Sequence, residues 1–380
     1  MDEGSLLGNI TGPSILDFSG TLAGDQLAPF GFLILQRCLF QIFGDSTYFM
    51  RLLPLISGVA AIFLFHRLAR RILAPRAALV ALALFCLSSD LIYYSAELKQ
   101  YSTDLAVSLL VLFAAANLLD RPLTCRSGAQ LAALVVASPW FSFSSSFLVA
   151  GAGATLLLER LCRRAYREAA TFCAIGALWG ISFGLCYRAT HAMLSQYTTM
   201  YIFWNFAFLP FPPRNLEDFR VFAGILLDLF VNPLNLVAPV LPAIGVIIPI
   251  VLLTLGLFSL GRRDRASLSL IALPLALAVI ASALRKYPLH GRLVLELVPS
   301  FFLLIAEGTE WIRQKNPARP WVYRTALILL LAYPLANGLI EGISRTPRSF
   351  DIHGDLRPNL FLHEHLTPPT FSRKPVADRP

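Results

Sequence analysis

Apolar segments long enough to cross a lipid bilayer recur along almost the whole chain, and they limit its fold more than any other feature. A transmembrane helix needs about 20 mostly apolar residues. Segments near this length follow one another at 52–70, 77–93, 102–119, 129–142, 143–158, 168–187, 238–260, 267–284, 291–310 and 322–342. The sequence therefore predicts an all-α polytopic transmembrane helix bundle with about ten spans, since a spanning helix satisfies its own backbone hydrogen bonds.

The amino-acid composition agrees with a membrane protein. Of the 380 residues, 56% are hydrophobic and only 14% are charged, and the mean hydropathy is +0.64. Soluble globular proteins carry about 25% charged residues. The net charge of +9 comes mainly from arginines in short loops, which is typical of cytoplasmic loops and not of a nucleic-acid-binding surface. We therefore expect the lipid bilayer as a partner and no nucleic acid.

The basic residues also predict which side of the membrane each loop faces. Arginine and lysine are frequent in alternate loops, at 67–76, 121–126, 160–167, 262–265 and 313–324. Positively charged loops favour the cytoplasmic side. The outer side then holds 1–50, 90–104, 188–237, 285–292 and 343–380. The polar stretches that are candidates for a functional site thus all fall on one face of the membrane.

Three regions follow from this topology. Residues 1–50 form an outer loop, residues 51–342 form the transmembrane domain, and residues 343–380 form an outer C-terminal tail. Within the first region, 27–43 is apolar but interrupted by polar side chains and short for a span. We interpret it as an amphipathic helix lying on the membrane, with a full span as the alternative.

The outer loop 188–237 is unusually long and contains many aromatic residues and prolines. Loops longer than about 12–15 residues are usually functional or disordered. This loop is too apolar for a solvated tail, so we expect it to lie against the membrane surface or to cap a cavity.

The stretch 90–104, which reads DLIYYSAELKQYSTD, places charges between two predicted spans. A charged side chain near the membrane centre costs about 2.5–3.5 kcal/mol on insertion scales. The stretch therefore sits at a membrane face or lines a wet cavity. One interpretation is an interfacial turn in which Glu97 pairs with Lys99. The other is one wall of a polar active site.

Two acidic or amide pairs precede the first span, Asp2-Glu3 and Asp25-Gln26. Adjacent carboxylates beside a membrane can supply a general base or hold a cation. Acidic residues near a terminus are more often simply solvated, so this pattern has low specificity on its own.

A basic segment, RKYPLHGR at 285–292, lies on the predicted outer face, where the charge rule does not expect it. Arg285, Lys286, His290 and Arg292 form a plausible phosphate clamp at the mouth of a helix. The alternative is a set of side chains that extend toward the membrane interface. The six cysteines are scattered without a CxxC pair, and we interpret them as small core residues.

In their order along the chain, these motifs resemble a known family. They are Asp2-Glu3, DQLAPFGF, FGDSTYFMRLLPLISG, YYSAELKQYS and YPLHGRLVLELVP. Together they resemble bacterial glycosyltransferases of family 39, which are related to dolichyl-phosphate-mannose protein mannosyltransferases and to the lipid A aminoarabinose transferase. The similarity is close over about residues 1–125 and returns at 285–300. It implies the GT-C architecture. In the family a transmembrane helix precedes the Asp-Glu motif, so we expect a segment upstream of Met1.

The resemblance implies an inverting glycosyltransferase of a bacterial inner membrane with a periplasmic active site. The donor would be a polyprenyl-phosphate-linked sugar and the acceptor a hydroxyl of a lipid, glycan or protein. The implied general base is Asp2 or Glu3, with Asp2 favoured. The implied donor phosphate-binding residues are Lys99, Arg285, Lys286, His290 and Arg292, and Asp25, Gln26, Glu97, Gln100 and Tyr101 would position the sugar or acceptor.

Phosphate is a good leaving group, so the reaction needs no nucleotide or metal, although a divalent cation is compatible with it. The alternative function is a transporter or flippase of lipid-linked saccharides. Transporters often contain repeats and place charges near the membrane midplane. No repeat is visible here and the charges gather at one face, which favours the enzyme. A homologue that only binds lipid-linked sugars is a third interpretation.

Overall fold

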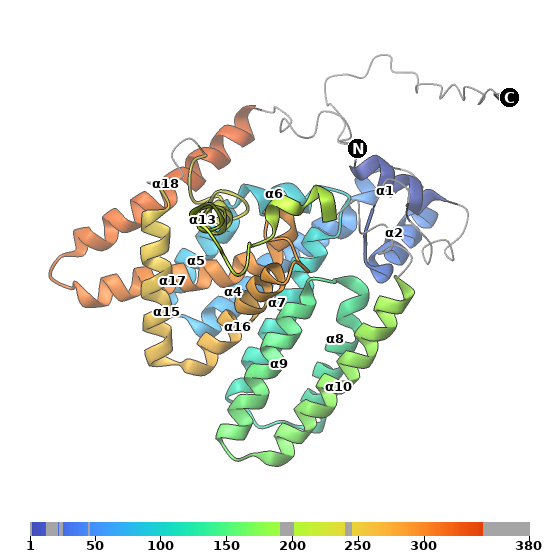
Figure 1. Cartoon of the computed structure of the whole chain (residues 1–380), viewed down its shortest axis with the longest axis horizontal. Coiled ribbons are helices and arrows are strands. Elements are labelled where there is room, and N and C mark those ends of the chain that lie inside the picture. The colour runs from blue at the N-terminus through green and yellow to red at the C-terminus, as the bar shows by residue number, and fades with distance from the viewer. Residues whose placement is uncertain are drawn as a thin grey trace.

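The computed structural model describes residues 2–12, 22, 26–44, 46–190, 201–239 and 245–344. All regular secondary structure in these ranges is helical (Figure 1). The predicted tail 343–380 lies almost entirely outside them, and so does Asp25. The predicted all-α class is confirmed.

Every predicted span coincides with a helix or a helix pair. The helices are α4 (Leu52–Ile72), α5 (Pro75–Leu87), α6 (Ser89–Ser95), α7 (Tyr101–Leu119), α8 (Cys125–Phe141), α9 (Ser145–Cys162), α10 (Tyr166–Ala189), α15 (Ile247–Arg263), α16 (Arg265–Ala283), α17 (Val298–Lys315) and α18 (Pro320–Ser344). The predicted span 77–93 is bent, because α5 and α6 meet at an angle of 56°.

The number of helices that can cross a membrane is smaller than the predicted ten. In the described part of the chain, six helices are long and apolar enough, or up to seven if the bent pair is one span. α8 and α15 fall short with 17 residues each. α17 carries Glu307, Glu310 and Arg313 in its C-terminal half. The chain is therefore a multi-pass membrane protein in which some helices are shorter or more polar than a simple span.

The core of the bundle forms around α17, whose side chains are mostly buried. α17 packs closely on α15, which lies beside it at the left of Figure 1. A Cβ atom on Gly256 would lie 1.8 Å from the carbonyl oxygen of Leu304, and one on Gly308 would lie 2.0 Å from that of Leu252. Glycine at both positions lets the two backbones touch, as small residues do at membrane helix crossings.

The N-terminal region forms a separate helical unit of α1 (Asp2–Thr11), α2 (Phe30–Phe43) and α3 (Thr47–Met50). The helix α2 matches the predicted helix over 27–43. Leu6, Ile10 and Phe32 are buried in a small apolar cluster that also contains Leu98, from the turn between α6 and α7. The unit is thus packed onto the turn that the sequence singled out.

The predicted loop 188–237 contains more regular structure than expected. A helix, α13 (Leu216–Val231), occupies its second half, and a short 3-10 helix, η2 (Asn205–Ala207), precedes it. Asn215 caps α13, because its side-chain oxygen accepts a hydrogen bond of 2.7 Å from the Asp218 N–H. The predicted outer loop 188–237 therefore contains a helix that the sequence analysis did not predict.

Candidate active site

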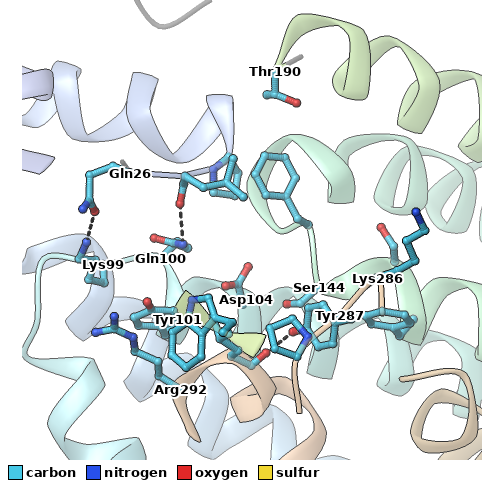
Figure 2. A pocket seen from close by; sticks show the side chains of 18 of the residues that line it. Gln26, Lys99, Gln100, Tyr101, Asp104, Ser144, Thr190, Lys286, Tyr287 and Arg292 are labelled. Carbon is cyan, nitrogen blue, oxygen red and sulfur yellow. Dashed lines mark hydrogen bonds between the residues drawn. The ribbon is translucent and has the colours of Figure 1, made fainter. Parts of the chain in front are cut away.

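A cavity of about 630 Å³ gathers segments that the topology prediction places on the outer side. Its lining comes from the N-terminal region, the turn between α6 and α7, the first turn of α9, the end of α10, and segments 201–208 and 286–293. Figure 2 shows the side chains around it. Segments far apart in the sequence thus meet at one site.

The turn between α6 and α7 forms one wall of the cavity. Lys99, Gln100 and Tyr101 all line it. Lys99 is buried and donates a hydrogen bond through Nζ to Gln26 Oε1, while Gln100 Nε2 donates to the Leu27 carbonyl oxygen at 3.1 Å. The last part of the stretch 90–104 therefore lines a cavity, and its interpretation as the wall of an active site stays a prediction.

Not every polar residue of that stretch belongs to the cavity. Asp90 is buried elsewhere, where its Oδ2 accepts a hydrogen bond of 2.6 Å from Asn235 Nδ2. Glu97 is also buried and is not among the described residues that line the cavity. Its predicted positioning role stays a prediction.

The end of α16 directs the first two side chains of the basic segment 285–292 to different places. Arg285 has a left-handed backbone conformation (φ 57°), and the N–H of Lys286 donates to the Ala281 carbonyl oxygen at 2.8 Å. This is a common way to end a helix, usually with glycine at the left-handed position. The chain turns there, so that Lys286 lines the cavity and Arg285 does not.

Arg285 instead packs against the segment 201–208, which follows α10 and is called the outer segment below. Its guanidinium lies 5.2 Å from the ring centroid of Tyr201 and 5.8 Å from that of Phe208, and it donates to Asn205 Oδ1. His290 also points elsewhere, with Nδ1 3.1 Å from Asp228 Oδ2 on α13. Neither residue is among the described cavity-lining residues, so this geometry gives their predicted contact with phosphate no support.

Three of the five predicted phosphate-binding cations do meet at the cavity: Lys99, Lys286 and Arg292. In Figure 2, Lys99 and Arg292 lie on one side, near Tyr101, and Lys286 lies on the other. Much of the remaining lining is aromatic, including Phe147, Phe183, Tyr187, Trp204 and Phe208. Trp204 and Phe208 come from the outer segment after α10, which fits the expectation that this segment covers a cavity.

The predicted catalytic acids occupy different positions. Asp2 belongs to α1, and its side chain lies outside what the structure describes. Glu3 is buried, and its carboxylate is held by Arg51, with Oε2 at 2.7 Å from Nη2, and by the Leu98 N–H, at 2.5 Å from Oε1. These contacts tie α1 to Arg51, between α3 and α4, and to the turn before α7. Glu3 therefore has a structural role, and its catalytic role stays a prediction.

Sequence reasoning missed a buried polar network beside the cavity. Its centre is Tyr287, whose hydroxyl oxygen lies 3.0 Å from Glu296 Oε1 in η3 (Gly291–Leu297). The Ser144 hydroxyl interacts with both groups, and Ser142 interacts with Asp104. Burial, and then the neighbouring Glu296, raise the pKa of Tyr287 well above its ordinary value. Tyr287 is thus a neutral hydrogen-bond donor.

The signal for this network was the serine run at 142–146, which lies at the boundary between the predicted spans 129–142 and 143–158. Ser142 follows α8, and its hydroxyl oxygen accepts a hydrogen bond of 3.0 Å from the N–H of Ser145, the first residue of α9. Ser144 and Ser146 then line the cavity with Asp104. In the part of the chain that the structure describes, no three His, Cys, Asp or Glu side chains are grouped as metal ligands.

No protein-family model matches the sequence, and no curated protein matches it. Solved structures of an archaeal oligosaccharyltransferase are among those similar to the chain. One is the oligosaccharyltransferase of Archaeoglobus fulgidus in complex with Zn and sulfate, with a TM-score of 0.49, 15% identity, and coverage of 82% of this chain and 44% of that chain.

Another is the archaeal oligosaccharyltransferase AglB from Archaeoglobus fulgidus, in complex with an inhibitory peptide and a dolichol-phosphate. It aligns with a TM-score of 0.52 and 12% identity over 92% of this chain and 52% of that chain. The fold is of the GT-C type. The chain spans about half the length of these solved structures. At this identity the likeness concerns the fold alone.

Proposed function

We propose that this GT-C-type chain is an inverting glycosyltransferase that moves a sugar from a polyprenyl-phosphate donor to a hydroxyl acceptor. The observation that carries the proposal is the meeting of Lys99, Lys286 and Arg292 at one cavity with aromatic walls. A prenyl phosphate combines an apolar chain with an anionic head, and cations beside aromatic side chains suit both parts. The dolichol-phosphate bound by AglB has the same two parts.

In the proposed reaction, the acceptor oxygen attacks the anomeric carbon from the side opposite the phosphate. The bond from that carbon to the phosphate oxygen breaks, and the phosphate leaves with the electron pair. The three cations would stabilise the charge that develops on the leaving group. Lys99 and Arg292 lie on the same side of the cavity in Figure 2, and we propose that they form the binding site for the phosphate.

The acceptor hydroxyl must lose a proton, and general-base catalysis typically contributes roughly 10²–10⁴-fold. We keep Asp2 as the proposed base, on the resemblance to glycosyltransferase family 39. Glu3 is the second candidate, although its pairing with Arg51 favours a structural role. We further propose a bacterial inner membrane, with the cavity on the periplasmic side and a lipid, glycan or protein as acceptor.

The decisive experiment is sugar transfer in membrane vesicles from labelled polyprenyl-phosphate sugars. We expect Arg292→Ala and Asp2→Asn to reduce transfer strongly, with the protein still inserted. Arg220→Ala is the matched control, because Arg220 lies exposed on α13 away from the cavity. Unchanged transfer in Asp2→Asn would move the base assignment to Glu3 or Glu97.

The alternative function is a transporter or flippase of lipid-linked saccharides. It makes a different prediction for the same vesicles: labelled lipid-linked sugar would change leaflets without any transfer to an acceptor. That result, in vesicles where the chain is inserted, would replace the enzyme by the transporter.

A further inference from the structure

Two polar atoms beside the cavity have no hydrogen-bond partner in the described part of the chain. They are Oδ1 of Asp104 and Oγ of Ser146, both shielded from solvent. Asp104 is nine-tenths buried in the first turn of α7, and Ser146 lies in the first turn of α9. An unsatisfied buried polar group costs about 1–3 kcal/mol. Two such groups at one cavity indicate that a ligand completes them.

Both side chains can reach the cavity. Asp104 and Ser146 are among its lining residues, and Figure 2 shows the Asp104 carboxyl group between Gln100 and Ser144. Ser142 interacts with the Asp104 carboxyl group, which leaves the other oxygen without a partner. The last side-chain torsion of aspartate is broad, so either oxygen can turn toward the cavity.

The chemistry of the two groups selects the ligand. An ionised carboxyl group only accepts hydrogen bonds, and the ionised oxygens of a lipid phosphate donate none. A hydroxyl group can donate to Asp104 and can exchange a hydrogen bond with the Ser146 hydroxyl. A sugar ring presents several hydroxyls at short spacing, whereas the prenyl chain presents none.

We infer that Asp104 and Ser146 bind hydroxyl groups of the sugar that is transferred, and so determine which sugar is accepted. This inference rests on the proposed function, because it assumes a sugar on a lipid phosphate. It divides the cavity into two parts, with the phosphate at Lys99 and Arg292 and the sugar at Asp104 and Ser146. A site that hydrogen-bonds a substrate hydroxyl can reject an analogue lacking it by about 10⁴–10⁵-fold.

The test compares binding of two kinds of probe to the purified full chain in lipid nanodiscs. One probe is bare polyprenyl phosphate. The others are polyprenyl phosphates that carry mannose, glucose, galactose, N-acetylglucosamine or arabinose. We expect at least one sugar to tighten binding over the bare lipid. Ser146→Ala should reduce this margin by about 3–10-fold and Asp104→Asn by about 10–100-fold, while binding of the bare lipid stays unchanged.

Ser108→Ala is the matched control. Ser108 lies on α7 like Asp104, and its Oγ is also buried without a described partner, but it does not line the cavity. It should leave the binding of every probe unchanged. Unchanged bare-lipid affinity in the Asp104 and Ser146 variants also shows that they fold.

The outcomes separate the two proposals. The inference is overturned if no sugar tightens binding, if the two variants weaken bare and glycosylated lipids equally, or if Ser108→Ala has the same effect. Specific sugar binding without transfer would overturn the proposed glycosyltransferase activity, but it would support the proposed sugar-binding role of Asp104 and Ser146. If neither kind of lipid binds, both proposals fall together.

Discussion

The guanidinium of Arg292 lies over the ring of Tyr101, 5.6 Å from the ring centroid, and both side chains line the cavity. Arg292 comes from η3 and Tyr101 from the first residue of α7, so this contact joins two distant parts of the chain. A cation held over an aromatic face is fixed in direction as well as in place.

The first prediction concerns this contact. Tyr101→Leu removes the aromatic face, and we expect the affinity for bare polyprenyl phosphate to fall by about 3–10-fold, because Arg292 is no longer held toward the phosphate. Tyr101→Phe keeps the ring and should bind almost as the wild type does. Equal losses in the two variants would assign the effect to the phenol hydroxyl instead. Titration with the lipid in nanodiscs measures both.

The second prediction separates the structural and catalytic roles of Glu3. Its carboxylate is buried and paired with Arg51 at 2.7 Å, and removing one partner of a buried ion pair costs about 3–5 kcal/mol. We expect Glu3→Gln and Arg51→Met each to lower the thermal midpoint in detergent. The double variant should recover part of the loss. A Glu3→Gln protein of unchanged stability that transfers no sugar would contradict the structural role and support catalysis by Glu3.

The third prediction concerns the contact between α15 and α17. In Gly256→Ala or Gly308→Ala, the new methyl group meets a backbone oxygen at 1.8 or 2.0 Å, so the helices must separate. Overpacking of this kind costs about 1–3 kcal/mol, and the thermal midpoint should fall accordingly. Gly180→Ala on α10 is the control, since nothing lies within 4 Å of its added methyl group. A midpoint that stays at the wild-type value would show that the two backbones do not touch.

The fourth prediction follows from Tyr287. Burial, and then Glu296, raise its pKa above the ordinary value, so the unfolded chain releases this proton at lower pH than the folded chain does. At a pH between the pKa of Tyr287 in the unfolded chain and its pKa in the folded chain, the folded state binds more protons. Its stabilising contribution is therefore complete below about pH 10, the pKa of an unperturbed phenol, and is lost as the pH rises further.

Thermal midpoints measured from about pH 8 to pH 11 test this dependence. The decline at alkaline pH should be smaller in Tyr287→Phe than in the wild type. Tyr166→Phe is the control, because Tyr166 is exposed at the start of α10. A wild-type decline that Tyr287→Phe leaves unaltered would assign the pH dependence to other groups.

Much of the fold was predictable because apolar length is a strong signal in a membrane chain. Each predicted span coincides with a helix or a helix pair, and the predicted boundary between 129–142 and 143–158 falls between the end of α8 and the start of α9. The helix α13 was missed, although Asn215 followed by LEDF is a good helix start. The many aromatic residues of 188–237 are typical of a loop at the membrane surface, and hydropathy alone does not distinguish such a loop from a helix.

The site was predictable only in part. The turn at 97–101 was found because charges between two spans are costly. Arg285 and Lys286 looked equivalent, and only the left-handed turn at the end of α16 sends them in different directions. The left-handed position of such a turn is usually occupied by glycine, so the arginine at 285 did not indicate a helix end. Asp104 and Ser146 come to the same cavity through the packing of α7 on α9, which no local sequence pattern predicts.

The hydrogen bonds from Lys99 to Gln26 and from Gln100 to the backbone of Leu27 have a consequence for how the chain can diverge. A change at position 99 removes the donor that Gln26 meets at the cavity, whereas position 27 offers only its carbonyl oxygen and tolerates many side chains. Among relatives of this chain, we therefore expect residues 26 and 99 to vary together and residue 27 to vary independently. Residues 26 and 99 would then evolve together, although 73 positions separate them along the chain.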